Sequence, residues 1–236
     1  MARRQDCLKQ VANELGEHFH VNCTSLKADL TLEADLRTME DFLAGAAHLQ
    51  LLVNNAGFGR RGRFYEAPIE SQDAMHRLHV LATMRLTHAA LRNLTARNTG
   101  AIINVASVAA YVPRPGSTSY YATKAWMNCF TECIYLELKT SGSQVRIQSL
   151  CPGFTYTEFH DVLGVERNFI SGGWWMSSED VVKESLEGLE QGKLFVIPGW
   201  RYKLLVSLLR LMPRSVVHYA LTRGPASLRR ERKPLK

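Results

Sequence analysis

The segment Gly100–Ser107 reads GAIINVAS, and it decides the fold class. Aliphatic residues occupy both of its alternating faces, which is typical of a strand that is buried on both sides of a parallel sheet. Apolar runs at 49–53, 145–150 and 194–197 are shorter strands of the same kind. Segments with helical spacing of apolar residues separate these runs. Strands and helices in turn predict an α/β fold with a doubly wound, Rossmann-like parallel sheet.

The spacing of apolar residues in the rest of the chain predicts the helices and one more strand. We expect helices at 7–15, 33–48, 71–93, 120–140, 178–190 and 200–212, and one further short strand at 19–27. A chain of 236 residues suits one domain of this kind, because 46% of it is apolar and only 22% is charged. We place the domain at 1–199 and a basic amphipathic helix with a tail at 200–236.

Charge and cysteine content narrow the class of protein. The net charge is +7, but 198–236 alone holds ten Lys or Arg and one acid, so the body is slightly acidic. This distribution argues against a nucleic-acid-binding body. No apolar run reaches the roughly 20 residues of a membrane span, and the N-terminus has no signal-peptide pattern. Five scattered cysteines without a CxxC pair predict a reduced, cytoplasmic protein. We expect Cys129 and Cys133 to pack in the core, and we expect no metal site.

Three residues form the pattern that carries chemistry. Ser107 follows the strand that ends in GAIINVA, and Tyr120 and Lys124 lie four residues apart on a predicted helix, so they share a face. A free tyrosine titrates near 10, and a neighbouring ammonium lowers that pKa. Ser107 is then placed to hold a substrate oxygen while Tyr120 gives or takes its proton. The isolated YxxxK pattern is weak, and Tyr121 is a rival for Tyr120.

The motifs combine into a more specific pattern. NNAG at 54–57, GAIINVAS at 100–107, YYATKA at 120–125 and CPGFTYTEF at 151–159 follow one another in this order and at these spacings. The sequence resembles the short-chain dehydrogenase/reductase family from residue 2 to about residue 199. The resemblance implies an NAD(P)-dependent oxidoreductase that moves a hydride between nicotinamide and a carbonyl or secondary alcohol. It also implies a homo-oligomer when the fold is complete.

The resemblance assigns roles to individual residues. It implies that Ser107, Tyr120 and Lys124 are catalytic, with Tyr120 and Lys124 also binding the cofactor. Asp29 and Asn55 then border the adenosine, with Asn55 also stabilising the sheet, and Gly57 lets the backbone approach the cofactor. The loop that borders the nicotinamide contains Pro152, Gly153 and Thr155. Arg3 matches a position that favours the 2′-phosphate, so we expect NADP, with NAD as the alternative.

Two departures from the family pattern stand out. His79 occupies the position of an Asn that supports a proton relay; it either continues such a relay or is a packed helix histidine. The family's first strand, its TGxxxGxG phosphate loop and its first helix have no counterpart. We therefore expect an N-terminally truncated sheet in which the strand at 49–53 is an exposed apolar edge. The absent loop leaves an alternative function open: a non-catalytic binding or interaction module.

The C-terminal third suggests the kinds of partner. Trp174 and Trp175 fall where the family has its substrate lid, which indicates an apolar small-molecule substrate; core packing is the alternative. The basic amphipathic segment at 200–212 is typical of a helix that docks on protein, or of a peripheral contact with an anionic membrane. Membrane association of a cytoplasmic protein is therefore the second prediction for location.

Overall fold

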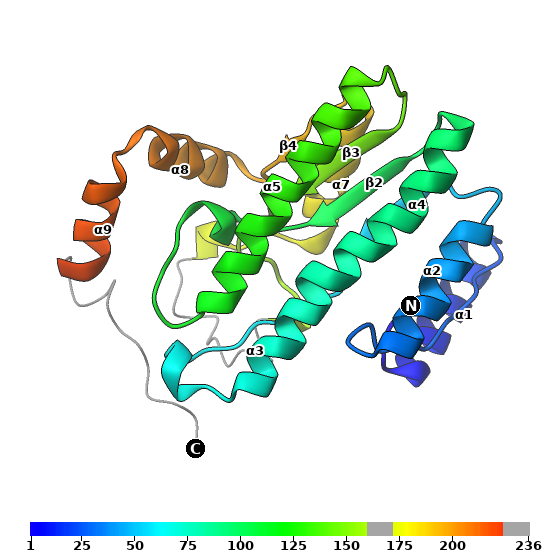
Figure 1. The fold of residues 1–236 in the computed structure, drawn as a ribbon, viewed down its shortest axis with the longest axis horizontal. Coiled ribbons are helices and arrows are strands. Elements are labelled where there is room, and N and C mark those ends of the chain that lie inside the picture. The colour runs from blue at the N-terminus through cyan, green and yellow to red at the C-terminus, as the bar shows by residue number, and fades with distance from the viewer. Residues whose placement is uncertain (160–171, 224–236) are drawn as a thin grey trace.

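The computed structural model describes residues 1–159 and 172–223. Its centre is a four-stranded sheet in the order β1-β2-β3-β4, and every neighbouring pair is parallel. The strands are β1 (Leu51–Asn54), β2 (Ala101–Val105), β3 (Arg146–Leu150) and β4 (Phe195–Val196). Figure 1 shows helical connections that return each strand to the same direction. The prediction of a doubly wound α/β sheet is therefore confirmed.

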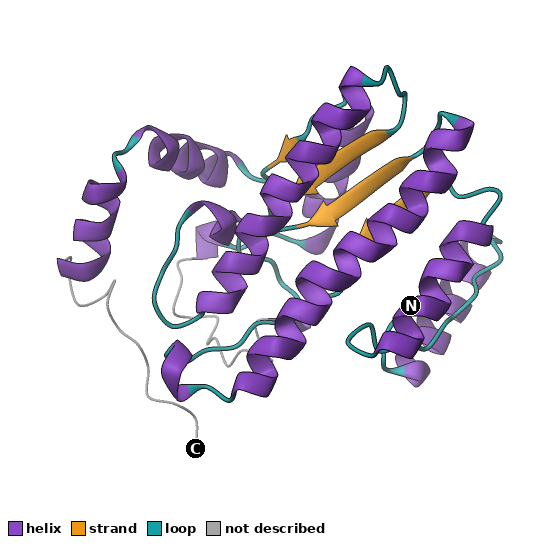
Figure 2. Cartoon of the chain, in the orientation of Figure 1, coloured by secondary structure: helices purple, strands orange, loops and turns teal. Residues whose placement is uncertain are grey.

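Helices cover both faces of the sheet. In Figure 2, α4 and α5 lie across one face and α7 lies behind the other. The described helices are α1 (Gln5–Phe19), α2 (Glu33–Gly45), α3 (Ile69–His76), α4 (Thr83–Arg97), α5 (Thr118–Thr140), α7 (Ser178–Glu190), α8 (Trp200–Leu211) and α9 (Arg214–Arg223). The expected helices are all present, with boundaries that differ by a few residues.

The alternation of side chains along the strands builds two separate cores. Ile102 of β2 packs with Leu94 of α4 and Ile134 of α5 on one face. Its neighbour Ile103 packs on the other face with Val181 of α7. A period of two residues sends successive side chains to opposite faces, so a strand that is apolar throughout requires helices on both.

The helix expected at 71–93 is interrupted. α3 and α4 are joined by a π-helical segment, Arg77–Ala82, within one continuous helical run. Such segments are frequent at functional sites because they displace the helix phase by one residue. Here the segment contains His79, which is fully buried.

The predicted strand at 19–27 is wrong. α1 continues to Phe19, and the residues that follow form only an isolated parallel bridge between Ala2 and Lys27. Phe19 and Val21 are 61% and 51% exposed. Apolar alternation makes a strand only where a neighbouring strand supplies hydrogen bonds, and the described residues supply only the bridge from Ala2 at the end of this segment.

The expected edge strand is present. β1 pairs with β2 on one side, and no strand within residues 1–159 and 172–223 pairs with its other side. Leu51 and Val53 are 39% and 47% exposed there. β1 is therefore an exposed apolar edge, as predicted.

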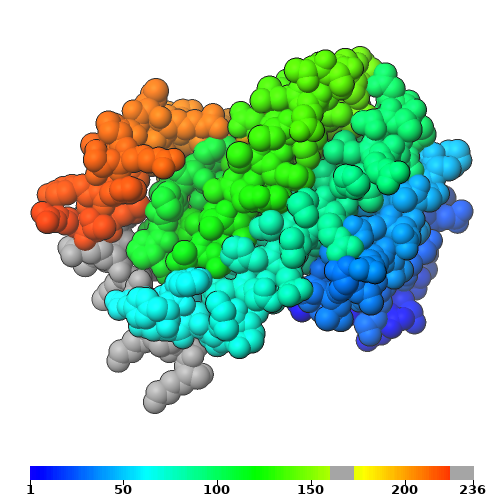
Figure 3. Space-filling model, viewed as in Figure 1, coloured from blue at the N-terminus to red at the C-terminus, as the bar shows by residue number. Residues whose placement is uncertain are grey.

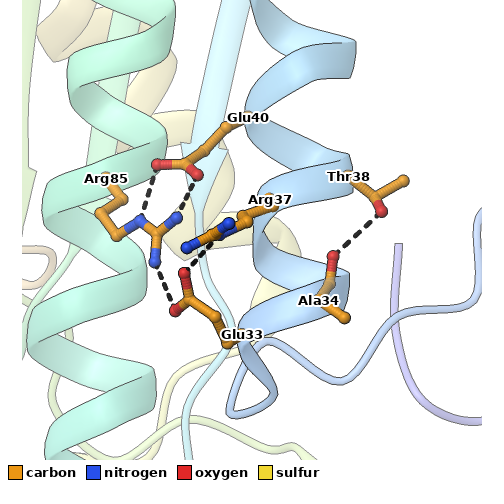
Figure 4. Close-up of polar contacts among 6 residues, drawn as sticks. All are labelled: Glu33, Ala34, Arg37, Thr38, Glu40 and Arg85. Carbon is orange, nitrogen blue, oxygen red and sulfur yellow. Dashed lines mark hydrogen bonds and ion pairs between the residues drawn. The ribbon is translucent and has the colours of Figure 1, made fainter.

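α2 is held against α4 by apolar packing and by one arginine. Leu36, Met39 and Leu43 of α2 lie in a buried cluster with residues of α4. Arg85 of α4 makes a two-pronged contact with Glu40 and donates from Nη1 to Glu33 Oε2 (2.6 Å), as Figure 4 shows. A two-pronged arginine–carboxylate pair fixes orientation as well as distance. These contacts fix the position of α2 relative to the sheet.

One expectation about the cysteines is wrong. Cys129 and Cys133 are exposed on α5, and only Cys151, directly after β3, is buried. Spacing alone did not show which face of α5 meets the sheet, because the helix has a weak apolar asymmetry.

Candidate active site

Ser107 lies just beyond the carboxyl end of β2. It begins a 3₁₀ turn, Val108–Tyr111, and its Oγ accepts a hydrogen bond from Ala109 N (3.1 Å). The same hydroxyl donates to Pro152 O (3.4 Å) in the loop after β3. Val108 N also donates to that carbonyl (3.0 Å). These contacts hold the ends of β2 and β3 together, at the edge where parallel α/β sheets bind ligands.

Tyr120 lies in the first turn of α5, close to Ser107. Burial raises the pKa of Tyr120 to about 12, although a side-chain hydrogen bond with Ser107 opposes the rise. The structure therefore brings Ser107 and Tyr120 together, whereas the charges that act on Tyr121 come from Arg114 and Arg61. Tyr120 is a neutral phenol at physiological pH, which is the form that donates a proton.

Lys124 follows one helical turn later and is 5% exposed. Its Nζ donates to Val105 O (2.6 Å) at the end of β2 and lies 5.9 Å from the centroid of the Tyr120 ring. Burial lowers the pKa of Lys124 to about 8. The expected lowering of the Tyr120 pKa is not found in this structure: burial of the phenol raises it, and the hydrogen bond with Ser107 offsets only part of the rise.

His79 links the strand-end loop to the catalytic helix. Phe58 N donates to His79 Nε2 (3.1 Å), so Nδ1 carries the proton and donates to Thr123 Oγ1 (2.9 Å). Thr123 in turn donates to Tyr120 O (3.1 Å). Burial lowers the pKa of His79 to about 3, which keeps the ring neutral. Protein groups engage both ring nitrogens, so the packed-histidine alternative fits this structure better than a water relay.

A buried amide network supports the same edge, and the sequence reasoning missed it. Asn54 Nδ2 donates to Thr87 Oγ1 (3.0 Å) and to Asn104 Oδ1 (2.8 Å). Asn104 Nδ2 donates to Thr131 Oγ1 (2.9 Å). The network joins β1, β2, α4 and α5. The sheet-stabilising contact expected of Asn55 belongs to Asn54, since strand alternation turns Asn54 inward and leaves Asn55 exposed. The sequence pattern that could have indicated this network is an Asn at the end of each of two neighbouring strands.

The residues expected at the adenosine side lie before α2 and after β1. Asp29 Oδ1 accepts from Thr31 N (3.0 Å) and Thr31 Oγ1 (2.7 Å), and Arg3 Nη1 lies 3.9 Å from Asp29 Oδ2. Partial burial raises the pKa of Asp29, but the contacts with Thr31 and Arg3 outweigh it, so the net shift is downward. Gly57 is exposed, and a Cβ there would lie 3.0 Å from His79 Nε2.

The loop after β3 is held by Tyr202 of α8. Its hydroxyl accepts from Phe154 N (2.9 Å) and donates to Trp174 O (2.6 Å). A Cβ on Gly153 would lie 2.0 Å from the Tyr202 ring, so this position requires glycine. Thr155 Oγ1 donates to Gly153 O (3.2 Å). The expected nicotinamide loop is thus braced from the C-terminal helix.

The two tryptophans belong to different contacts. Trp175 is buried, with its ring 5.5 Å from Phe154 and 5.0 Å from Tyr156, while Trp174 lies edge-on to Tyr202 (5.2 Å). The substrate lid was predicted at these two tryptophans, and residues 160–171 before them lie outside the described residues. Phe159 places its ring 5.8 Å from Tyr120. Phe159 therefore places an aromatic ring beside Tyr120.

The residues present fit the nicotinamide end of a dinucleotide. The Lys124 ammonium has three donors, and Val105 O takes one of them in the described structure. The others are available to the hydroxyl groups of a ribose. For the pyrophosphate, the described ranges contain no glycine-rich turn that opens a helix at this edge of the sheet.

A Rossmann-like sheet with Ser107, Tyr120 and Lys124 gathered at its strand ends defines a class of protein, and the comparisons agree with it. A family model described as short chain dehydrogenase matches residues 1–167. The chain belongs to the short chain dehydrogenase family.

Individual relatives show how far the likeness extends. A very-long-chain 3-oxoacyl-CoA reductase from Macaca fascicularis is 31% identical over 67% of this chain and 51% of its own length. The chain thus spans about half the length of that relative. A short-chain dehydrogenase from Sphingobium yanoikuyae, solved in complex with NADPH, is 29% identical with a TM-score of 0.78, over 90% of this chain and 85% of that one. A bulky-bulky ketone specific alcohol dehydrogenase from Comamonas testosteroni is 27% identical with a TM-score of 0.75, over 91% and 84% of the two chains.

Proposed function

We propose that the protein is an oxidoreductase that reduces the carbonyl group of an apolar ketone to a secondary alcohol, with NADPH as its reductant. The observation that carries the proposal is the convergence of Ser107, Tyr120 and Lys124 at one edge of the sheet. Ser107 donates a hydrogen bond from its hydroxyl group to the carbonyl oxygen, and Tyr120 transfers its proton to that oxygen as it becomes an alkoxide. The nicotinamide, when bound, supplies the hydride.

The protonation state of the site provides the acid that carbonyl reduction requires. The pKa of Tyr120 is raised to about 12, so the phenol holds its proton at physiological pH. Lys124, with its pKa lowered to about 8, remains mostly charged at pH 7 and can donate hydrogen bonds to a ribose. A neutral acid beside a cation is suited to neutralise an oxyanion that forms between them.

Two further features support the substrate class and the cofactor. The apolar substrate class is supported by Phe159, which lies against Tyr120. NADPH is supported by the Sphingobium relative, which was solved with that cofactor. The Comamonas relative is described as specific for bulky ketones. Arg3, which is 69% exposed at its side chain, lies beside Asp29 and offers a cation for a 2′-phosphate. NAD is the alternative cofactor.

The test is turnover by the purified full chain. NADPH fluorescence is followed with a series of alkyl and aryl ketones, and with polar ketones as a contrast. Tyr120→Phe is expected to lower kcat by roughly 10²–10⁴, because it removes the acid and keeps the ring. Tyr121→Phe is the matched control and is expected to retain activity. Loss in Tyr121→Phe with activity retained in Tyr120→Phe would refute the assignment, and no turnover with any ketone would favour the non-catalytic binding module.

A further inference from the structure

The C-terminal helices α8 and α9 carry an exposed apolar stripe. α8 docks on the body through Tyr202 and Val206, which are 3% and 2% exposed. Its opposite side is also apolar: Leu204, Leu208 and Leu211 are 53%, 51% and 83% exposed. Their spacing of four and three residues places them in one row along the helix.

The bend after α8 and the helix α9 also carry exposed apolar side chains. Val216 and Tyr219 of α9 are 49% and 63% exposed, Met212 between the two helices is 41% exposed, and Trp200 at the start of α8 is 68% exposed. We call these seven residues (Trp200, Leu204, Leu208, Leu211, Met212, Val216 and Tyr219) the outer stripe. Figure 3 shows α8 and α9, in orange to red, projecting from the end of the molecule opposite α1 and α2. An exposed apolar row of this length indicates an interaction surface.

The charged side chains that α8 and α9 themselves carry are of one sign. Residues 200–223 contain five Lys or Arg and no Asp or Glu. Lys203 pairs with Glu184 of α7 (2.8 Å), and the Arg210 guanidinium lies over the Tyr111 ring (4.9 Å), so both help to dock α8. Arg214 and Arg223 remain exposed on α9. A surface that is apolar and cationic together complements an anionic lipid surface, and a second copy of the same cationic stripe would be repelled.

The dimensions favour a helix pair that lies on a bilayer. In the described part of the chain no single helix is long and apolar enough to cross one; α8 and α9 reach that length and composition only as a pair, bent by 112°. Twelve and ten residues span roughly 18 and 15 Å, against a hydrocarbon thickness of about 30 Å.

We propose that the outer stripe of α8 and α9 binds the surface of an anionic lipid bilayer, with its apolar side chains in the headgroup boundary and Arg214 and Arg223 among the lipid phosphates. Because Tyr202 of the same α8 braces the loop after β3, this contact places the candidate active site next to the bilayer surface. The inference rests on α8 and α9 and holds whether or not the proposed reduction is correct.

The experiment measures co-sedimentation of the full chain with vesicles. Vesicles of phosphatidylcholine alone are compared with vesicles that also contain phosphatidylglycerol, at low and high salt. We expect binding to the anionic vesicles that salt weakens. The double variant L208S/L211S is expected to bind at least tenfold more weakly. Its matched control, Leu136→Ser, removes a leucine that is 55% exposed on α5 and is expected to bind as the unchanged chain does.

A second variant covers the case in which L208S/L211S folds poorly. R214E/R223E leaves the apolar row intact and is expected to weaken anionic binding roughly tenfold or more. Equal binding to neutral and anionic vesicles, or no binding to either, would overturn the proposal. Resistance to alkaline carbonate extraction would show a spanning segment and would also overturn it. So would a dimer, seen by light scattering, that L208S/L211S converts to monomer without any effect of vesicles.

Discussion

Replacing His79 by alanine tests the most unusual feature of the site. The substitution leaves the Phe58 N–H without its buried acceptor, which costs about 1–3 kcal/mol. It also removes a fully buried ring from the junction of the π-helical segment with α5, at a further cost of about 2 kcal/mol or more. We expect the free energy of unfolding to fall by roughly 3–5 kcal/mol.

The pH dependence of stability tests whether the His79 ring is buried in its neutral form. The pKa of His79 falls from 6.5 to about 3 on folding, so the unfolded chain binds one proton more between these values. The contribution of His79 to stability is therefore complete above about pH 6.5 and is lost as the pH falls toward 3. The upper bound of that loss is about 5 kcal/mol.

The assay is urea unfolding of three proteins between pH 4 and pH 8. His76→Ala is the matched control, because His76 lies one turn earlier and is exposed; we expect a change within about 0.5 kcal/mol. The difference in stability between the unchanged chain and His79→Ala should shrink as the pH falls. A His79→Ala protein as stable as His76→Ala would refute the bracing role, and a difference that does not change with pH would refute burial of the neutral ring.

Three other substitutions test separate parts of the structure. Lys124→Met should abolish turnover. The pKa of Lys124 is about 8 in the folded chain and 10.5 in the unfolded chain, so the free energy of unfolding of the unchanged chain should rise by roughly 3 kcal/mol relative to the variant as the pH rises from 8 to 10.5. Arg85→Ala should lower the free energy of unfolding by about 1 kcal/mol, measured in urea at low salt, since it leaves Glu40 without its two-pronged partner. Arg3→Ala should weaken NADPH binding about tenfold in a fluorescence titration and leave NADH binding unchanged; equal losses for both cofactors would contradict a contact with the 2′-phosphate.

The sequence was sufficient to predict the sheet and the meeting of the candidate catalytic residues. Buried parallel strands are apolar on both faces, and GAIINV at 100–105 has this property, so its place in the centre of the sheet was predictable. The carboxyl ends of parallel strands share one edge, which brought Ser107 toward the helix that carries Tyr120 and Lys124.

The errors arose where long-range contacts decide the outcome. The segment at 19–27 has the apolar pattern of a strand but no described neighbour to pair with, and pattern alone does not reveal the neighbour. The pKa of Tyr120 depends on how deeply the phenol is buried, which spacing from Lys124 does not show. Asn54 and Asn55 differ by one position in the strand, and that one position decides which of them points inward.

The most direct test of the central claim is the turnover rate of the double variant S107A/Y120F. If Ser107 and Tyr120 act on the same carbonyl oxygen, each single substitution removes most of the rate enhancement that the two hydroxyl groups provide together. The double variant should then be about as slow as Tyr120→Phe alone. The rate constants come from NADPH consumption at saturating ketone, with Tyr121→Phe as the control. A double variant slowed by the full product of the two single effects would contradict a shared site, because it would show that the two hydroxyl groups contribute independently.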